Sequence, residues 1–236
     1  MTDIATLTTT DTGKSYAWKY TDLKRAAEKM HGPEPPPTAE ERQGGNPYLA
    51  RYLRLIKDTE DVATNGDSEI APCARYDRRR EMIKVFSWAI PNDAAIRLLR
   101  RHSPLIEIGA GTGYWAWMVE QEGGIVLTYD SWQAHFKTET RWMRVKRGGP
   151  AMIKYHPEAT LFLCWPPYDE PMAHTCPKNY SGEFFLYEGE DSSGCTGDDN
   201  FHDELNTHWK LKRKVAVPKW SGIHDSLFLY QRNGKG

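Results

Sequence analysis

The sequence predicts an α/β fold with a mostly parallel sheet and one antiparallel strand. From residue 94 onward, apolar segments of strand length alternate with helical patterns, which is typical of βαβ units. The last two apolar segments, 214–217 and 226–230, follow each other without a helical pattern between them, so they predict a closing antiparallel pair. A chain of 236 residues is long enough for one such domain and an extension.

The N-terminal third reads as a helical extension that precedes the sheet. Residues 1–15 are polar and Thr-rich, and they predict a disordered tail. Apolar residues at helical spacing predict helices over 16–30 and 47–62, while 65–73 reads as a loop. A further helical pattern begins at Asp77 and leads into the main domain. The predicted division is a tail at 1–15, an extension at 16–76 and the main domain at 77–236.

The main domain contains the strands and the helices that connect them. A helix over 94–101, capped by Asn92 or Asp93, leads into a buried strand at 105–108. A helix over 200–209 has Asp198 or Asp199 in position to cap it. The other expected strands are 125–130, 142–146, 159–165, 183–187, 214–217 and 226–230.

A glycine-rich stretch, Glu107-Ile108-Gly109-Ala110-Gly111-Thr112-Gly113, joins the first strand to a helix expected from near Thr112. Glycines allow a sharp turn and a close approach to a ligand, and the helix start offers free N–H groups. Asp130 ends the next strand 23 residues after Glu107, the spacing of a carboxylate that binds a ribose diol. Tyr114 replaces the third glycine of the dinucleotide pattern, and Glu107 would repel a pyrophosphate. The stretch therefore favours a nucleoside ligand with a cationic end.

This stretch, together with Asp130, resembles the first motifs of class I S-adenosylmethionine-dependent methyltransferases, over roughly residues 80–236. The resemblance implies a Rossmann-like three-layer sandwich with a seven-stranded sheet, S-adenosyl-L-methionine as cofactor and S-adenosyl-L-homocysteine as product. The alternatives are a Rossmann-like dehydrogenase and a sheet that no longer binds a cofactor. Trp88, just before the first strand, is expected either at the methionine end of the cofactor or as an ordinary core residue. The implied cofactor-binding residues are Glu107, Gly109, Ala110, Gly111, Gly113, Tyr114, Trp115, Asp130, Ser131, Trp132 and Trp88.

A second motif, Trp165-Pro166-Pro167-Tyr168, resembles the (Asp/Asn/Ser)-Pro-Pro-(Tyr/Phe/Trp) motif of amino-group methyltransferases. Two prolines stiffen the turn and leave a carbonyl free to accept from an N–H, while the aromatic ring stacks on the acceptor. The departure is Trp165, which stands where that family has a polar side chain. The alternative is that the prolines only end a strand. The expected catalytic residues are Trp165, Pro166, Tyr168 and Glu188, with the Trp165 or Pro166 carbonyl, Asp169 and Glu190 as further hydrogen-bond acceptors.

Composition restricts the partners. The formal net charge of −1 favours neither nucleic acid nor a membrane surface, although basic clusters such as 78–80 and 210–214 are either solvated faces or, together, a track for a polyanion. No apolar run is long enough to span a bilayer, and the cysteine usage favours a reduced, cytoplasmic setting. The spacing of Cys176, Cys195 and the nearby histidines matches no standard zinc arrangement, so no metal is predicted. His224-Asp225 is either a base with its orienting carboxylate or a turn.

The predicted function is a methyltransferase that methylates a nitrogen of a planar or amide-bearing acceptor. The acceptor is a nucleobase, a small molecule or a protein side chain. Only 58 residues separate Glu107 from Trp165 and 68 follow Tyr168, which leaves little room for a region that reads duplex DNA. The alternative is a non-catalytic binding module that keeps the fold. The acceptor, the methylated atom and the oligomeric state stay open from the sequence.

Overall fold

A computed structural model describes residues 33–63, 70–131, 140–168, 170–192 and 194–234. The predicted tail and the helix expected over 16–30 lie outside these residues. Residues 33–236 form one compact unit. In chain order the elements are η1 (Glu41–Gln43), α2 (Pro47–Ala63), α3 (Ile70–Val85), α4 (Asp93–Arg101), β1 (Leu105–Ile108), α5 (Tyr114–Gln121), β2 (Val126–Asp130), β3 (Lys146–Arg147), η2 (Pro150–Tyr155), β4 (Thr160–Cys164), α6 (Met172–Asn179), β5 (Phe184–Gly189), α7 (Asp199–His208), β6 (Trp209–Ala216) and β7 (Ser226–Arg232).

The strands form a seven-stranded sheet in the order β3-β2-β1-β4-β5-β7-β6. β7 runs antiparallel to both of its neighbours, and the other pairs are parallel. The mostly parallel sheet with one antiparallel strand is thus confirmed, and the fold is Rossmann-like. The strand order reverses between β1 and β4, and in open α/β sheets ligands bind beyond the carboxyl ends of the strands at such a switch point.

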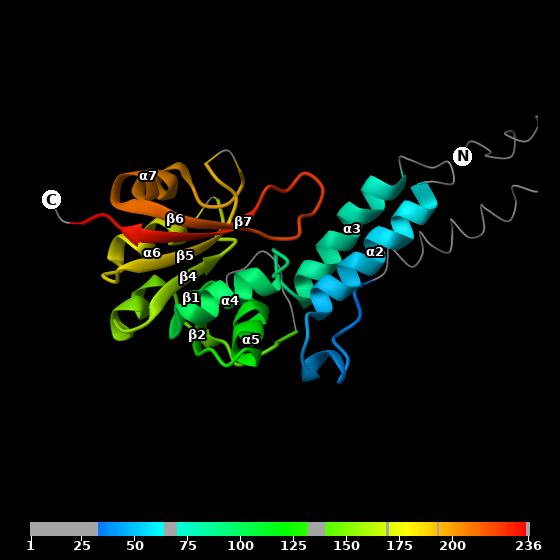
Figure 1. Ribbon diagram of the computed structural model, residues 1–236, viewed down its shortest axis with the longest axis horizontal. Coiled ribbons are helices and arrows are strands. Elements are labelled where there is room, and N and C mark those ends of the chain that lie inside the picture. Colours follow the sequence, from blue (N-terminus) through cyan, green and yellow to red (C-terminus); the bar gives the residue numbers. More distant parts are fainter. Residues whose placement is uncertain (1–32, 64–69, 132–139, 169, 193, 235–236) are drawn as a thin grey trace, which may run out of the picture. The chain divides into compact units, whose positions relative to one another are not determined.

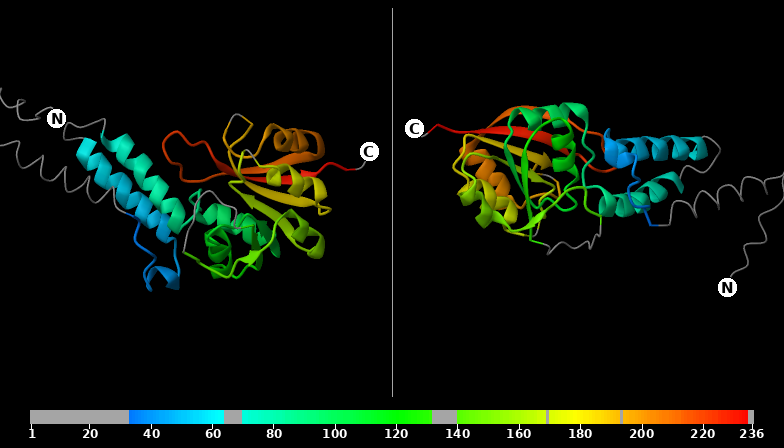
Figure 2. Two further views of the ribbon diagram at one scale, coloured as in Figure 1. Left: turned by 180° about the vertical axis from the view of Figure 1, so that it is seen from behind. Right: turned by 90° about the horizontal axis from the view of Figure 1, so that it is seen from below.

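Helices cover both faces of the sheet and make three layers (Figures 1 and 2). Side chains alternate along each strand, so Ile106 and Ile108 of β1 face the layer of η2, α6 and α7, with which they form one buried cluster. The opposite face is covered by α4 and α5, and here Phe162 of β4 lies 5.8 Å from the Trp115 ring of α5. By the same alternation Glu107 and Glu188 lie on the α4/α5 face.

Several element boundaries differ from the prediction. The α4 cap is confirmed, because Asn92 Oδ1 accepts a hydrogen bond from Ala95 N at 2.9 Å. The loop predicted over 65–73 is wrong from Ile70 on, where α3 begins and runs without a break through the predicted domain boundary at 76/77. β3 is only two residues long and shares Lys146 alone with the predicted strand at 142–146, and β6 begins at Trp209 rather than at 214. The alternation in β6 is hidden because it is an edge strand whose side chains at 210–214 are charged or exposed.

The extension is joined to the carboxyl-end edge of the sheet. The loop between β6 and β7 reaches toward α2 and α3 (Figure 1), where Tyr52 of α2 donates to the Lys219 carbonyl at 2.7 Å. Trp220 Nε1 donates to the Tyr48 hydroxyl at 3.1 Å. These bonds hold α2 beside that loop, and Arg79 of α3 lies 5.1 Å from the ring of Trp165, the residue that follows β4. Within the described ranges, no helix has the length and apolar character needed to cross a membrane.

Candidate functional site

The glycine turn after β1 is held open by its own backbone. Gly109, Gly111 and Gly113 all have positive φ, of 80°, 55° and 76°. The amides of Gly109 and Ala110 both donate to the Tyr129 carbonyl of β2. A Cβ built on Gly111 would meet nothing within 4 Å among the described residues, whereas one on Gly109 would lie 3.1 Å from Met172 Cε. The space beside Gly111 is therefore the accessible part of the turn.

Asp130 faces this turn from the end of β2. Its Oδ2 accepts a hydrogen bond from Gly111 N at 2.8 Å, and its side chain is buried. The carboxylate therefore fixes the middle glycine and stands at the rim of the same space. This is the juxtaposition that the spacing between Glu107 and Asp130 predicts.

Glu107 lies beneath the turn on the α4/α5 face and is 2% exposed. Burial, and then the nearby charge of Asp130, raises its pKa to about 8. Its Oε2 is one of three buried polar atoms at this edge of the sheet that have no hydrogen-bond partner among the described residues, and we call these three the open atoms. The open atoms are Oε2 of Glu107, and Nε and Nη2 of Arg79.

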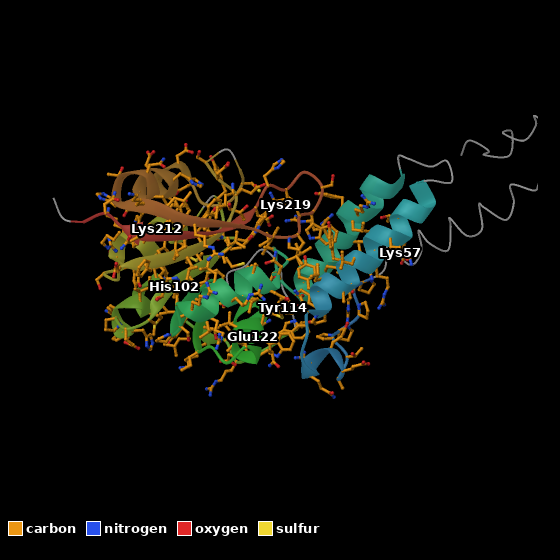
Figure 3. The ribbon with its side chains drawn as sticks, in the orientation of Figure 1. Lys57, His102, Tyr114, Glu122, Lys212 and Lys219 are labelled. Carbon is orange, nitrogen blue, oxygen red and sulfur yellow. The ribbon has the colours of Figure 1, made fainter. Side chains whose placement is uncertain are left out.

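Three of the expected cofactor residues serve the core around the turn. A Cβ on Gly113 would lie 2.8 Å from Met143 Cγ, so packing alone requires a glycine there. The Tyr114 hydroxyl donates to Asn46 Oδ1 and accepts from Tyr48 N. Figure 3 labels Tyr114. Trp115 donates to the Ala89 carbonyl.

The remaining expected cofactor residues are Ser131, Trp132 and Trp88. Ser131 directly follows β2 and is exposed. Trp132 lies outside the described residues. Trp88 is partly buried, and its ring stacks on Trp165 with the centroids 5.4 Å apart and the planes 10° from parallel. Trp88 therefore belongs to the cluster at the end of β4 that the second motif forms.

The second motif ends β4 as predicted, but its first residue turns inward. Trp165 has φ of 50°, a left-handed conformation that is strained for a large side chain and that no other described non-glycine residue adopts. This conformation buries the indole, whose Nε1 donates to Asp225 Oδ2 at 3.1 Å. Pro166 is buried and its carbonyl accepts from Gly197 N at 3.0 Å. Tyr168 is 49% exposed at the end of the motif.

Two carboxyl groups meet behind the Trp165 indole. Glu188, from the end of β5, is 0% exposed, and Asp225, just before β7, is 1% exposed. Burial, then the charge of Asp225, raises the pKa of Glu188 well above its usual range, and a hydrogen bond between the two carboxyl groups acts in the same direction. Burial also raises the pKa of Asp225 to about 6, against the Trp165 hydrogen bond and the charge of Arg79. The pair therefore shares a proton and carries one negative charge near neutral pH.

Arg79 of α3 completes this cluster. Its guanidinium carbon lies 5.1 Å from the Trp165 ring centroid and 5.4 Å from that of Trp88. Its Nε and Nη2, which together form one side of the guanidinium fork, are both open atoms. The arrangement leaves a partly buried guanidinium with two unused donors next to a carboxyl pair that carries one negative charge.

Two other carboxylates that the sequence offers as candidates, Glu190 and Asp225, have hydrogen-bond partners within the fold. Both oxygens of Glu190 accept backbone hydrogen bonds, from His224 N at 2.7 Å and Cys195 N at 2.9 Å. Although burial opposes it, these bonds lower the pKa of Glu190. His224 is exposed while Asp225 bonds the indole, which favours the turn over the base-and-carboxylate pair. Asp169 lies outside the described residues.

The sequence does not predict that Arg79 and Asp225 belong to one cluster, although both contact the Trp165 indole. Arg79 stands in the basic run 78–80, which read as a solvated face, whereas Arg79 is partly buried and Arg78 pairs with Glu34 at 2.5 Å. No spacing in the sequence relates Arg79, Trp165 and Asp225. In the part of the chain that the structure describes, no three His, Cys, Asp or Glu side chains are arranged to hold a metal ion.

A cavity of about 560 Å³ lies at the opposite end of β5 and β7. Residues of both signs of charge line it, among them Glu183, Lys210 and Arg232. None of the expected site residues that the structure describes lines this cavity. The residues with unusual chemistry are instead gathered at the carboxyl ends of β1, β2, β4 and β5.

Comparison with known proteins assigns the chain to no family, because no family model and no curated protein sequence matches it. Solved structures do match. One of them is the crystal structure of the E81Q mutant of MtNAS, with 11% sequence identity and a TM-score of 0.40, covering 93% of this chain and 99% of that chain. Similarity of this degree carries no argument about the present chain. The fold is therefore assigned from its own strand order.

Proposed function

We propose that this chain is an S-adenosylmethionine-dependent methyltransferase that methylates a nitrogen atom. The observation that carries the proposal is the meeting of three features at the switch point of the sheet. These are the open space at Gly111, the carboxylate of Asp130 at its rim, and the open oxygen of the buried Glu107. A nucleoside with a cationic end complements all three.

The residues present fit this cofactor by their donor chemistry. Asp130 is in position to accept from a ribose diol while it still holds the Gly111 amide. Glu107 offers a buried acceptor that an ammonium group would satisfy, and its ionised form is stabilised by such a neighbour. The glycine backbone allows the nucleoside to lie close to the turn, because Gly111 carries no side chain into that space.

The helix start argues against a dinucleotide. Pyrophosphate sites use free N–H groups at the first turn of the helix. Here Gly113 N already donates to the Ala110 carbonyl at 2.8 Å, and Tyr114 N donates to Thr112 Oγ1 at 3.3 Å. These contacts favour a sulfonium nucleoside over a nicotinamide dinucleotide.

S-adenosylmethionine supplies an electrophilic methyl group. In the reaction the acceptor nitrogen forms a bond to the methyl carbon, the sulfur–carbon bond breaks with its electron pair going to sulfur, and one proton leaves the nitrogen. The chain contributes mostly positioning and exclusion of water. Trp88 and Trp165 provide apolar walls, Tyr168 provides an aromatic surface at the rim, and Asp225 is in position to take the proton, directly or through Glu188.

Ligand binding and methyl transfer test the proposal separately. Isothermal titration calorimetry with S-adenosylhomocysteine is expected to show one site per chain, and the melting temperature should rise with ligand concentration. Tritiated methyl transfer from S-adenosylmethionine into separate nucleic acid, protein and metabolite pools then identifies the acceptor class. Absence of binding at millimolar ligand would refute the proposal. Binding without transfer to any pool would favour a non-catalytic module.

A further inference from the structure

Buried polar groups border two different parts of the carboxyl-end edge. Glu107 belongs to β1, next to the glycine turn, whereas Glu188 belongs to β5 and Asp225 directly precedes β7. One strand, β4, separates β1 from β5, so the two groups are about 10 Å apart at the usual strand spacing. The second group therefore lies beyond the nucleoside position, on the far side of the place where the transferred methyl would be.

This second group combines donors and acceptors around one indole. Trp165 Nε1 bonds Asp225 Oδ2, and the same indole ring lies 5.1 Å from the Arg79 guanidinium carbon. A guanidinium with unused donors and a carboxyl pair with one negative charge thus border the same side chain. A buried donor without a partner is unfavourable, and two such donors on one guanidinium are difficult to explain by structure alone.

The guanidinium and the carboxyl pair favour different partners. Nε and Nη2 of Arg79 form the side of the fork that binds a carboxylate through two parallel hydrogen bonds. The Glu188–Asp225 pair carries one negative charge, which attracts an ammonium group with its N–H donors. One guanidinium charge against one negative charge on the carboxyl pair leaves the cluster close to neutral, which suits a ligand with no net charge.

We propose that the methyl acceptor is a small zwitterionic amine of the amino acid class. Its carboxylate would bind the Arg79 fork and its amino group would face Asp225 and Glu188, between the Trp88–Trp165 pair and the sulfonium methyl. This rests on the proposed function and makes it more specific. This proposal also explains the strained conformation of Trp165, which turns the indole inward so that both charged ends of the acceptor would pack against it.

The test uses the full chain, tritiated S-adenosylmethionine and three matched pools. The first pool contains free amino acids, namely the standard ones with ornithine, β-alanine and γ-aminobutyrate. The second contains the corresponding amines that lack the carboxylate. The third contains the corresponding N-acetyl derivatives. We expect label in at least one free amino acid. Removal of either charged end should slow transfer roughly tenfold or more, because it leaves buried partners unpaired.

Arg79→Lys is the deciding variant, because it keeps the charge and removes the fork. It should lower transfer to the preferred amino acid about tenfold and reduce its preference over the decarboxylated amine, while the affinity for S-adenosylhomocysteine stays within about twofold. Arg80→Lys, on the exposed neighbouring position of α3, is the matched control and should change neither quantity.

The outcomes separate the inference from the function on which it rests. If the wild type binds S-adenosylhomocysteine but labels only nucleic acid, protein or simple amines, the amino acid acceptor is wrong and the methyltransferase remains. If Arg79→Lys weakens S-adenosylhomocysteine about as much as transfer, the fork belongs to the methionine end of the cofactor, and the acceptor assignment is overturned. If the wild type does not bind S-adenosylhomocysteine, the proposed function itself fails.

Discussion

The two halves of the carboxyl-end edge are built in different ways. The half at β1 and β2 is local, because Glu107, the glycine turn and Asp130 lie within 23 residues and are joined by backbone hydrogen bonds. The half at β4, β5 and β7 is assembled from distant segments, with Arg79 from α3, Trp165 after β4 and Asp225 before β7. A local half suits a ligand shared by many proteins, and an assembled half suits one that is particular to this chain.

The buried carboxyl groups show the same difference. Burial is the main cause of the raised pKa of Glu107, and no cationic group among the described residues compensates its charged form. Glu188 and Asp225 are also buried, but they have each other, the Trp165 indole and the charge of Arg79. Variants that affect one half and leave the other unchanged therefore test whether the halves bind separate ligands.

The largest effect is expected from Gly111→Arg. The side chain would fill the only described space at the turn, and affinity for S-adenosylhomocysteine should fall about 100-fold or more. Gly123→Arg is the matched control, because Gly123 also has positive φ (78°) and open space but stands past the far end of α5. Calorimetry should show loss of binding in the first variant alone. Retained binding in Gly111→Arg would remove the nucleoside from this turn.

Asp130→Asn should weaken S-adenosylhomocysteine about tenfold, because a charge-assisted hydrogen bond to the ribose becomes a neutral one. The asparagine carbonyl can still accept from Gly111 N, so the turn should keep its shape. Asp203→Asn, at an exposed position of α7, serves as control. Unchanged affinity would mean that Asp130 is only a structural support for the glycine turn.

Tyr168→Ala should act on the other half. Because the ring is 49% exposed, stability should change little, while kcat/KM for the acceptor should fall severalfold to about tenfold. The S-adenosylhomocysteine dissociation constant should not change. Tyr155→Ala, at a tyrosine of η2 that is 62% exposed, should leave both quantities as they are. Equal loss in both variants would exclude Tyr168 from the acceptor site.

The smallest effect is expected in the pH dependence of stability. The folded-state pKa of Glu107, about 8, lies above its usual value of 4.5, so the folded state holds a proton that the unfolded state has released. This group therefore reduces stability progressively as the pH rises from about 4.5 to 8. Glu107→Gln should raise the melting temperature by several degrees more at pH 8 than at pH 5. Differential scanning calorimetry, with the exposed Glu122→Gln as control, measures this difference, and a gain independent of pH would contradict the protonated state.

The extent of successful prediction follows the same division. The strands at β1, β2, β4 and β5, the Asn92 cap and the Asp130 contact could be predicted, because each depends on residues close in sequence. The start of α3 could not, since Pro72 in its first turn reads as a break although a proline is tolerated there. The edge strand β6 was predicted too short because solvent exposure removes the alternation on which strand prediction depends.

The sequence by itself determined the parallel sheet, the glycine turn and the carboxylate at its rim, because local backbone geometry and strand periodicity dictate them. Only the tertiary structure decided that Trp165 turns inward and that Glu188 and Asp225 share a proton. It also decided that Arg79, in the basic run 78–80, packs against the Trp88 and Trp165 rings. The physical reason is burial. Whether a charged side chain is solvated or desolvated depends on what the rest of the chain packs around it, and no spacing along the sequence records that.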